Sequence, residues 1–388
     1  MKSDKREKFS TVINKLICDS VKKRATDIHF NCFESDAKIR IRVDGVLQTV
    51  GTIAKKEYLE ICDALKEMSG LSMDEKRLPQ DGRCLLSIEK KPVDLRVSVM
   101  PCVFGENICL GILSKEALCL DIGKAGFSEH QLGTVRKWCG KPNGIVLVTG
   151  PAGSGKTTVE YMILNELNKE SSNVFSVEDP VEYTIPGVNQ VQINPRAGLT
   201  FSSTIRAILR QDPDVVMVGE IRDFETVQIM VETAITGHLV LSTLHTNTAT
   251  EAVLRLKDLG LEPFLIKDAV TGIINQRLVR ILCKECREKY VPDDITLQHF
   301  KLKKQEYYKA AGCKSCNSTG YRGRCGIYEL YEPGHTTMNM LLKGCSDEEL
   351  RGHALGEGMI SLFQDGVSKA EQGITSLEEV IRAASGVI

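Results

Sequence analysis

The chain has 388 residues, of which 42% are hydrophobic and 26% charged, and its formal net charge is −1 at pH 7. This length predicts two or three domains of ordinary globular composition. The near-neutral charge argues against direct nucleic-acid binding, although a local basic patch stays compatible with it. No apolar run reaches the roughly 18 residues that span a bilayer, and no signal-peptide core follows the charged N-terminus. We therefore expect a cytoplasmic protein that reaches a membrane only through protein partners.

Short elements with alternating hydrophobic residues fill the first part of the chain. Ile39, Ile41 and Val43 would lie on one face of a strand that ends at an Asp44-Gly45 hairpin turn. With an amphipathic N-terminal helix, this pattern predicts a small α+β domain over residues 1–115. The expected elements are helices over 9–22 and 55–70 and strands over 37–43, 46–50, 83–88, 93–99 and 106–113.

Residues 116–143 are expected to form a linker with a leading helix over 128–138, which glycine and proline flank. From residue 144 onward, apolar strands alternate with helical segments. This alternation predicts an α/β domain over 144–388, with a mostly parallel sheet and helices on both faces. The expected strands cover 145–149, 173–178, 214–218 and 239–243, and the closing helices cover 337–343, 347–354, 359–372 and 376–384.

A glycine-rich segment follows the first of these strands and precedes a helical pattern. It matches the phosphate-binding P-loop at every fixed position, in the strand–turn–helix context that the motif requires. The glycines let successive backbone N–H groups face phosphates, and the helix N-terminus adds a positive dipole end. Lys156 should reach the phosphates of ATP, and the Thr157 hydroxyl should bind Mg²⁺. The residues expected at the nucleotide are Gly150, Pro151, Ala152, Gly153, Ser154, Gly155, Lys156, Thr157 and Thr158.

Carboxylates follow two later strands, at the sheet edge where α/β proteins bind ligands. Glu178, Asp179 and Glu182 could orient water or bind Mg²⁺ indirectly, although a solvated turn would have the same composition. Glu220 ends the other strand, with Gly219 at the position where P-loop enzymes usually have Asp. We expect Glu220 to be the general base for the attacking water.

Hydrogen-bonding side chains are concentrated around the strand at 239–243. His238 precedes this strand, while Ser242, Thr243 and His245 lie at its end. Such a group could sense the γ-phosphate of a nucleotide, and we expect His245 to do so. A histidine satisfied by its neighbours in the core or on the surface is the alternative.

The 14 cysteines fall into two groups. Ten are scattered singly, mostly among apolar residues, and are expected to be reduced thiols that act as small hydrophobic residues. The other four form two Cys-x₂-Cys pairs, which can hold Zn²⁺ in a closed tetrahedron of thiolates. A redox dithiol is the main alternative, but it would need only one pair. We expect a structural zinc subdomain over 281–328, with the ligands Cys283, Cys286, Cys313 and Cys316.

Taken together, these motifs resemble those of the bacterial ATPases of type II secretion and type IV pilus assembly. The resemblance covers nearly the whole chain and includes the P-loop, the strand-end carboxylates, the histidine segment and the cysteine pairs. The further segments that carry it are 24–30, 40–45, 79–83, 94–98, 218–223, 357–359 and 364–366.

The resemblance implies a homo-hexamer on the cytoplasmic face of the inner membrane, with a PAS-like N-terminal domain and a RecA-like P-loop domain. ATP would bind between these domains and the neighbouring subunit, and its hydrolysis would drive assembly of a pseudopilus or pilus. The implied partner is an inner-membrane platform or a cytoplasmic docking protein of the secretion or pilus machine.

Arginines complete the nucleotide site in this family. The matching positions are Arg96 in the first domain and Arg206, Arg210, Arg222 and Arg255 in the second. These side chains would offset charge on the transferring phosphoryl group. Arg206 and Arg210 are also spaced as an i,i+4 pair, so a contact along a helix face is the alternative for them.

Two departures from the family pattern carry expectations of their own. Family members usually have an additional N-terminal domain that binds the membrane partner, and this sequence begins close to the domain that follows it. Docking by the usual route is therefore not expected. Gly111 stands where the family strand has an arginine, so hydrolysis should be weaker and Gly111→Arg should raise it.

Three other functions stay open. A pilus-retraction motor would be a close relative, but such motors generally lack the two cysteine pairs. A RecA-like motor for DNA uptake or competence is disfavoured by the near-neutral charge. A nucleotide-bound scaffold with weak hydrolysis is disfavoured by Lys156, Thr157 and Glu220, whereas Gly111 favours it.

Overall fold

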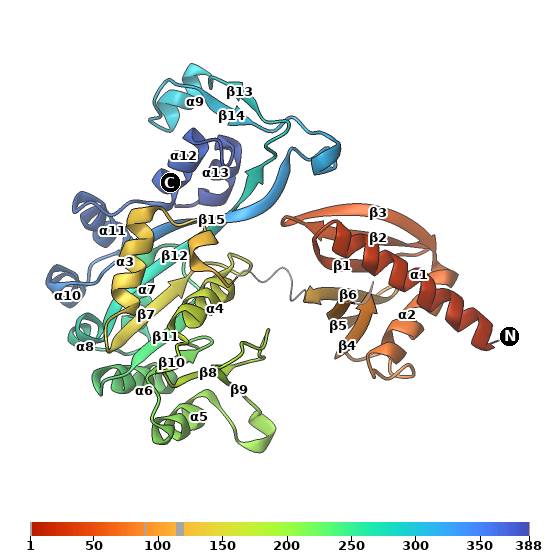
Figure 1. Ribbon diagram of the computed structural model, residues 1–388, viewed down its shortest axis with the longest axis horizontal. Helices are drawn as coiled ribbons and strands as arrows, with labels where there is room; N and C mark the ends of the chain where they lie inside the picture. Colours follow the sequence, from red (N-terminus) through yellow and green to blue (C-terminus); the bar gives the residue numbers. More distant parts are fainter. Residues whose placement is uncertain (1, 89–90, 114–119, 388) are drawn as a thin grey trace. The chain divides into compact units, whose positions relative to one another are not determined.

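The computed structural model describes the backbone of residues 2–88, 91–113 and 120–387, which form two compact units (Figure 1). Unit 1 spans Met1–Leu118 and unit 2 spans Cys119–Ile388. Residues 116–119 of the predicted linker lie outside the described residues. Within the described part of the chain, no helix is both long and apolar enough to cross a bilayer.

Unit 1 is a six-stranded antiparallel sheet that packs against two helices. The strand order is β3-β2-β1-β6-β5-β4, so the first strand of the chain lies inside the sheet. The elements are α1 (Lys2–Lys22), β1 (Ala25–Cys32), β2 (Asp36–Val43), β3 (Val46–Ala54), α2 (Lys55–Met68), β4 (Gln80–Ile88), β5 (Lys91–Cys102) and β6 (Gly105–Leu113).

The pleat of this sheet separates an apolar face from a polar one. On β1, Ile28 and Phe30 are fully buried, and the Phe30 ring stacks on Tyr58 of α2 at 6.3 Å between ring centroids. The residues that alternate with them, Asp27 and His29, lie on the opposite face and are half-buried. The helices therefore cover the apolar face, and polar side chains line the other face.

Unit 2 is built on a seven-stranded sheet of order β15-β12-β7-β11-β10-β8-β9. All neighbouring strands are parallel except β15, which is antiparallel to β12, and this confirms the predicted mostly parallel α/β sheet. The strands are β7 (Gly144–Thr149), β8 (Val174–Glu178), β9 (Asn189–Gln192), β10 (Val215–Val218), β11 (Leu239–Leu244), β12 (Val270–Leu282) and β15 (Tyr321–Tyr331).

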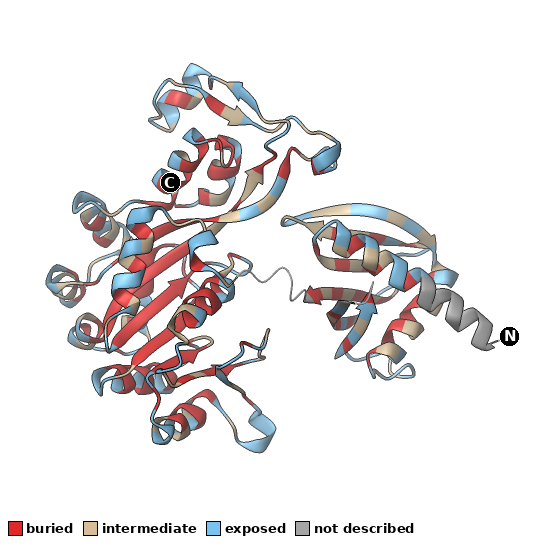
Figure 2. Ribbon diagram, in the orientation of Figure 1, coloured by how far each residue is buried: buried red, intermediate tan, exposed pale blue. Residues whose placement is uncertain are grey.

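Both faces of the central strands are buried (Figure 2). On β7, Ile145 and Leu147 pack in the large core with α5 to α8, while Val146 and Val148 are equally buried on the other face. Burial on both faces explains why β7 is a continuous apolar run in the sequence. The helices are α3 (Glu129–Cys139), α4 (Lys156–Leu167), α5 (Phe201–Ile208), α6 (Phe224–Ile235), α7 (Ala249–Asp258), α8 (Pro263–Ala269), α10 (His335–Leu342), α11 (Asp347–Gly356), α12 (Leu362–Glu371) and α13 (Leu377–Ala384).

Helix α3, predicted as part of the linker, packs into unit 2. The Trp138 indole is buried, its Nε1 donates to Glu332 at 3.0 Å, and its ring lies directly against Gly272 of β12. The amide of Gln131 donates to Asp365 of α12 at 3.1 Å. A helix between glycine and proline has the sequence pattern of a connection, and only these long-range contacts reveal that it belongs to the core.

An insertion separates β12 from β15, an antiparallel pair that the sequence analysis did not predict. It contains β13 (Glu288–Tyr290) and β14 (Tyr307–Lys309), which pair antiparallel, and α9 (Asp294–His299) lies between them in the chain. Figure 1 shows this insertion beyond the ends of the two long strands, next to α12 and α13. The four paired cysteines belong to it.

Candidate functional site

The glycine-rich loop joins the end of β7 to the first turn of α4, in the predicted strand–turn–helix arrangement. Gly150, Gly153 and Gly155 have φ angles of +147°, +75° and +87°, which residues with side chains rarely adopt. A Cβ on Gly150 would also lie only 2.6 Å from the Gln276 carbonyl oxygen. The loop therefore needs glycine for both conformation and space, and its N–H groups and helix N-terminus suit an anion.

Lys156 reaches across the loop toward the next strand. Its Nζ donates to the carbonyl oxygens of Gly150 at 2.9 Å and Pro151 at 3.1 Å, and lies 3.4 Å from Nδ1 of His245. An ammonium can only donate, so Nδ1 accepts and the ring proton is assigned to Nε2. Burial and the charge of Lys156 lower the pKa of His245, which favours this neutral ring.

Glu220 lies on the other side of the same imidazole. Its Oε2 is 3.9 Å from Nε2 of His245, and its Oε1 accepts from Nε of Arg222 at 2.8 Å. Arg222 also forms an ion pair with Asp179 at 3.4 Å, which joins two strand-end segments. The predicted base, one predicted arginine and the predicted histidine are thus brought together.

Glu178 is buried at the end of β8 within a polar network. One carboxylate oxygen accepts from Ser176 at 2.6 Å and Gln190 at 3.1 Å, and the other accepts from the Tyr161 hydroxyl. The Tyr161 oxygen in turn accepts the backbone N–H of Glu182 at 3.2 Å. These contacts fix Glu178 in position and connect it to the segment of Glu182.

Glu160 is a residue of this site that the sequence analysis missed. Its side chain is only 1% exposed, and Oε1 has no hydrogen-bond partner among the described residues. Burial, together with the nearby charge of Glu178, raises the pKa of Glu160 well above its usual range. The available signal was an acidic residue four positions after Lys156, on the same helix face.

These groups surround a cavity of about 250 Å³ at the carboxyl ends of the strands. Thr157 and Thr243 line it, together with Glu160, Glu182 and Glu220. This is the edge at which open α/β sheets bind ligands. Of the other predicted residues, Thr158 is exposed on α4, and neither it nor Arg210 is among the described residues that line the cavity.

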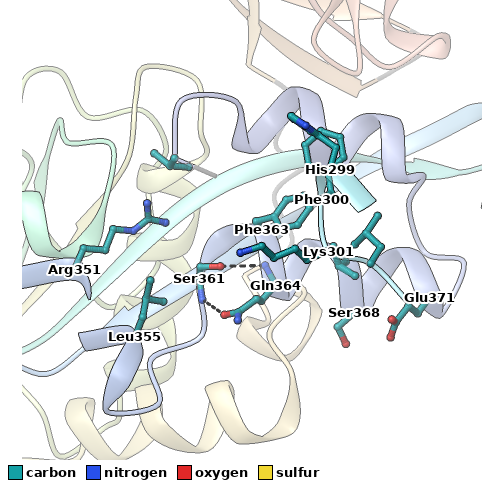
Figure 3. Close-up of a pocket in the computed structure, with 13 residues that line it drawn as sticks. His299, Phe300, Lys301, Arg351, Leu355, Ser361, Phe363, Gln364, Ser368 and Glu371 are labelled. Carbon is teal, nitrogen blue, oxygen red and sulfur yellow. Dashed lines mark hydrogen bonds between the residues drawn. The ribbon is translucent and has the colours of Figure 1, made fainter. Parts of the chain in front are cut away.

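A larger cavity of about 680 Å³ lies between α9 and the C-terminal helices (Figure 3). Phe300 and Phe363 contribute apolar walls, and the Ser361–Gln364 capping box lies beside them. The described residues that line it include no glycine-rich loop and no strand-end carboxylates, so size alone does not make it the nucleotide site. The smaller cavity has the chemistry that phosphates require.

The two cysteine pairs converge in the insertion. Sγ–Sγ distances are 3.8 Å for Cys283–Cys313, Cys286–Cys316 and Cys313–Cys316, and all four sulfurs lie within 4.8 Å of one another. A tetrahedron with Zn–S bonds of about 2.3 Å has edges of about 3.8 Å. The N–H of Gly320 also donates to Cys316, at 3.2 Å. The four thiols therefore fit a zinc ion.

Comparisons with known proteins identify the family of this chain. A family model described as "Type II/IV secretion system protein" matches residues 2–382. The chain belongs to the type II/IV secretion system protein family. It is 47% identical to the type II secretion system ATPase E of Vibrio cholerae over 96% of this chain and 74% of that protein. It is 43% identical to the type IV pilus assembly ATPase PilB of Thermus thermophilus over 95% of this chain and 42% of that protein.

Solved structures support the fold. The Legionella pneumophila ATPase DotB superposes with a TM-score of 0.70 at 20% identity, over 95% of this chain and 94% of that chain. The pilus retraction motor PilT with bound ADP gives a TM-score of 0.63 at 24% identity, over 97% of each chain. The α/β architecture of the type II/IV secretion family is therefore shared by both.

The remaining family arginines lie in different surroundings. Arg96 is on β5 of unit 1, where its cross-strand partners are Arg83 on β4 and Gly111 on β6. Arg210 follows α5, is half-buried, and donates to the carbonyl oxygen of Arg206 at 2.8 Å. Arg222 is not among the described residues that line the cavity, but it contacts Glu220, which lines it.

Proposed function

We propose that the chain is an ATPase whose hydrolysis of ATP drives assembly of a pseudopilus or pilus, in type II secretion or type IV pilus biogenesis. One observation carries the enzymatic part: Lys156 and Glu220 both lie beside His245, at 3.4 Å and 3.9 Å, on the wall of one cavity. Membership of the type II/IV secretion family and the names of its relatives support the coupling to secretion or pilus assembly.

The P-loop would bind the nucleotide. When bound, ATP supplies the phosphoryl group that is transferred to water, and Mg²⁺ offsets its charge. The backbone N–H groups between Gly150 and Thr158, apart from Pro151, which has none, would hold the phosphates, and the Thr157 hydroxyl would hold Mg²⁺. Lys156 would exchange its contacts with the loop carbonyls for the phosphate oxygens, because both are acceptors within reach of its ammonium.

Glu220 would accept the proton of the attacking water. Its contact with Arg222 would fix the carboxylate, and Nε2 of His245 lies 3.9 Å from it, so the water could be oriented between these groups. Glu178 is held by three side chains and would act as a positioning residue for the segment of Glu182, which lines the same cavity. Arg222 would also offset charge on the phosphoryl group.

A hexamer is part of the proposal. Arg96 and Arg210 would then supply charge at a site shared between subunits, as the family resemblance implies. Sizing the purified chain by light scattering with and without a non-hydrolysable ATP analogue tests this. A monomer at all protein concentrations, with nucleotide bound, would contradict it.

We also propose that the cysteine insertion binds Zn²⁺ as a structural ion. Four thiolates close the coordination shell, so no position is open for a substrate. The protein would act in the cytoplasm, bound to an inner-membrane platform or docking protein of its machine. A pull-down of the full chain with candidate platform proteins from the same genomic neighbourhood tests the partner.

Phosphate release by the purified full chain separates an ATPase from a scaffold. The expected result is ATP-dependent release that is lost in Lys156→Ala, while Lys169→Ala, outside the loop, keeps it. A chain that binds ATP but releases no phosphate would support the scaffold with weak hydrolysis, which Gly111 favours. Activity that survives in Lys156→Ala would overturn the assignment of the site.

A further inference from the structure

The polar face of the unit 1 sheet holds a second group of metal-ligating side chains. Asp27 and His29 are two residues apart on β1, so both lie on the same face. Cys109 on β6 is the direct cross-strand partner of His29. The antiparallel register therefore places three different donor types side by side, far from the P-loop in the sequence.

The distances within this group fit a common ion. One ligand atom from each of the three residues lies within 4.8 Å of the others. Nε2 of His29 is buried and has no hydrogen-bond partner among the described residues. A buried ring nitrogen without a partner is unfavourable, and a metal ion is a partner that restores the lost interaction.

The neighbouring residues leave a coordination position for Asp27. Its recorded contacts within the described chain, from Thr26 at 2.7 Å and from Arg42 at 3.6 Å, both involve Oδ2. Opposite Asp27 on β6 is Gly111, which has no side chain to fill the space. Oδ1 takes part in neither of these contacts and can therefore serve as a metal ligand.

The local charge is compatible with a divalent ion. An aspartate, a thiolate and a neutral imidazole balance a charge of +2, so the bound group would be neutral beside the two nearby arginines. Arg40 is already engaged, because its Nε and Nη2 donate to Asn31 at 3.1 Å and 2.8 Å. Arg42 donates to the Gly45 carbonyl oxygen at 3.1 Å, in addition to its ion pair with Asp27.

We propose that Asp27, His29 and Cys109 form a second metal site, which binds Zn²⁺ or a similar transition-metal ion. Mixed nitrogen, oxygen and sulfur donors suit this class and disfavour Mg²⁺ and Ca²⁺, which prefer oxygen ligands. Three protein ligands leave one coordination position open to water. The site is separate from the four cysteines, because its ligands belong to unit 1.

Counting zinc in the purified full chain tests this site. The chain is stripped with a chelator under reducing conditions, dialysed against Zn²⁺, and measured by elemental mass spectrometry. His29→Ala and Cys109→Ser should each lose about one equivalent of zinc relative to the unsubstituted chain, whatever the four cysteines bind. Ser98→Ala is the matched control, because Ser98 on β5 is the cross-strand partner of Cys109 on the side away from β1.

Equal zinc content in all four chains would overturn the proposal. Thiol alkylation of the unsubstituted chain gives an independent answer if the variants do not fold. Zn²⁺ should slow the modification of Cys109 by at least about tenfold, whereas the exposed Cys102 should react at the same rate with and without Zn²⁺. Equal rates at Cys109 with and without Zn²⁺ would also overturn the proposal.

Discussion

Lys156 Nζ lies 3.4 Å from His245 Nδ1, although the two residues are 89 positions apart in the sequence. The contact exists because β7 and β11 are neighbours in the sheet, and each residue follows the end of one of these strands. A nucleotide bound to the P-loop would therefore meet the histidine at the end of β11. This pair would connect the proposed phosphate site to Glu220, the proposed general base, which lies 3.9 Å from the same ring.

His245→Ala should lower kcat by about 10²-fold and leave ATP affinity nearly unchanged, because the ring acts on the water and the base. The pKa of His245 is lowered, so the ring stays neutral down to its ordinary value of about 6.5 and becomes protonated only at lower pH. Activity should therefore stay level near neutral pH and fall below about pH 6.5. A pH profile of phosphate release checks this. The same fall in activity below about pH 6.5 in His245→Asn would contradict the proposed role of the imidazole ring.

Glu160→Gln should stabilise the protein. The raised pKa means that Glu160 keeps its proton in the folded chain, whereas in the unfolded chain it releases the proton above about pH 4.3. The free energy of unfolding therefore falls as the pH rises from about 4.3 toward the raised pKa of the folded state. Glutamine removes this penalty, and we expect a gain of about 1–2 kcal/mol at neutral pH and little gain near pH 4. Urea unfolding at neutral pH and near pH 4 measures this gain in the free energy of unfolding, with the exposed Glu170→Gln as control. A loss of stability in Glu160→Gln at neutral pH would show that the Glu160 carboxylate is needed in the fold.

Gly272→Ala should destabilise unit 2. A Cβ at this position would lie 2.3 Å from the buried Trp138 ring, so either the ring or β12 must move. Overpacking of this kind costs about 1–3 kcal/mol. Gly133→Ala on α3 is the matched control, because no atom of the described chain lies within 4 Å of its added Cβ, and it should stabilise the helix slightly. Thermal melting of Gly272→Ala and Gly133→Ala measures the difference. Equal melting temperatures of the two variants would contradict the close packing of Gly272 against Trp138.

Gly111→Arg should raise ATPase activity per hexamer. The position can accept a side chain, because among the described residues an added Cβ meets only the Arg96 Cβ, at 3.7 Å. We expect an increase of about tenfold if this arginine adds charge at the phosphoryl group. Gly111→Gln, which has similar length but no charge, should not reproduce it. Unchanged or lower phosphate release in Gly111→Arg would refute the idea.

Removal of zinc should destabilise the insertion between β12 and β15. The Sγ atoms of Cys283 and Cys313, and those of Cys286 and Cys316, are 3.8 Å apart. Without a bound ion, nothing would hold the two Cys-x₂-Cys pairs together. Cys286→Ser should therefore increase proteolysis between residues 283 and 316, while Cys345→Ser, outside the insertion, should not. The same cleavage pattern in both variants would speak against a structural ion.

Local patterns predicted much of this protein, whereas long-range contacts were not accessible from the sequence. The P-loop was predicted because strand, turn and helix are contiguous, and β7 was apparent because both of its faces are buried. Strand β12 was missed because Asn275, Gln276 and Arg277 interrupt its apolar pattern, although the first two are buried. In its edge partner β15, buried and exposed residues alternate at one end only, so the sequence pattern of a strand is weak there.

The candidate site shows the same division. The P-loop and His245 are recognisable from their own sequence segments, but the contact between Lys156 and His245 depends on the strand order. Glu160 gave no strong signal, because its importance comes from burial beside Glu178. The group of Asp27, His29 and Cys109 could not be predicted, because it depends on the register between β1 and β6.

We propose above that ATP is hydrolysed in the cavity beside Lys156, with Glu220 as the base. Parallel measurements of ATP affinity and phosphate release by Glu220→Gln test this proposal, with Glu232→Gln on α6 as the control. We predict unchanged affinity and phosphate release slowed by at least about 10²-fold in Glu220→Gln, with both quantities unchanged in the control. Phosphate release at the unsubstituted rate by Glu220→Gln, with ATP bound, would contradict the claim.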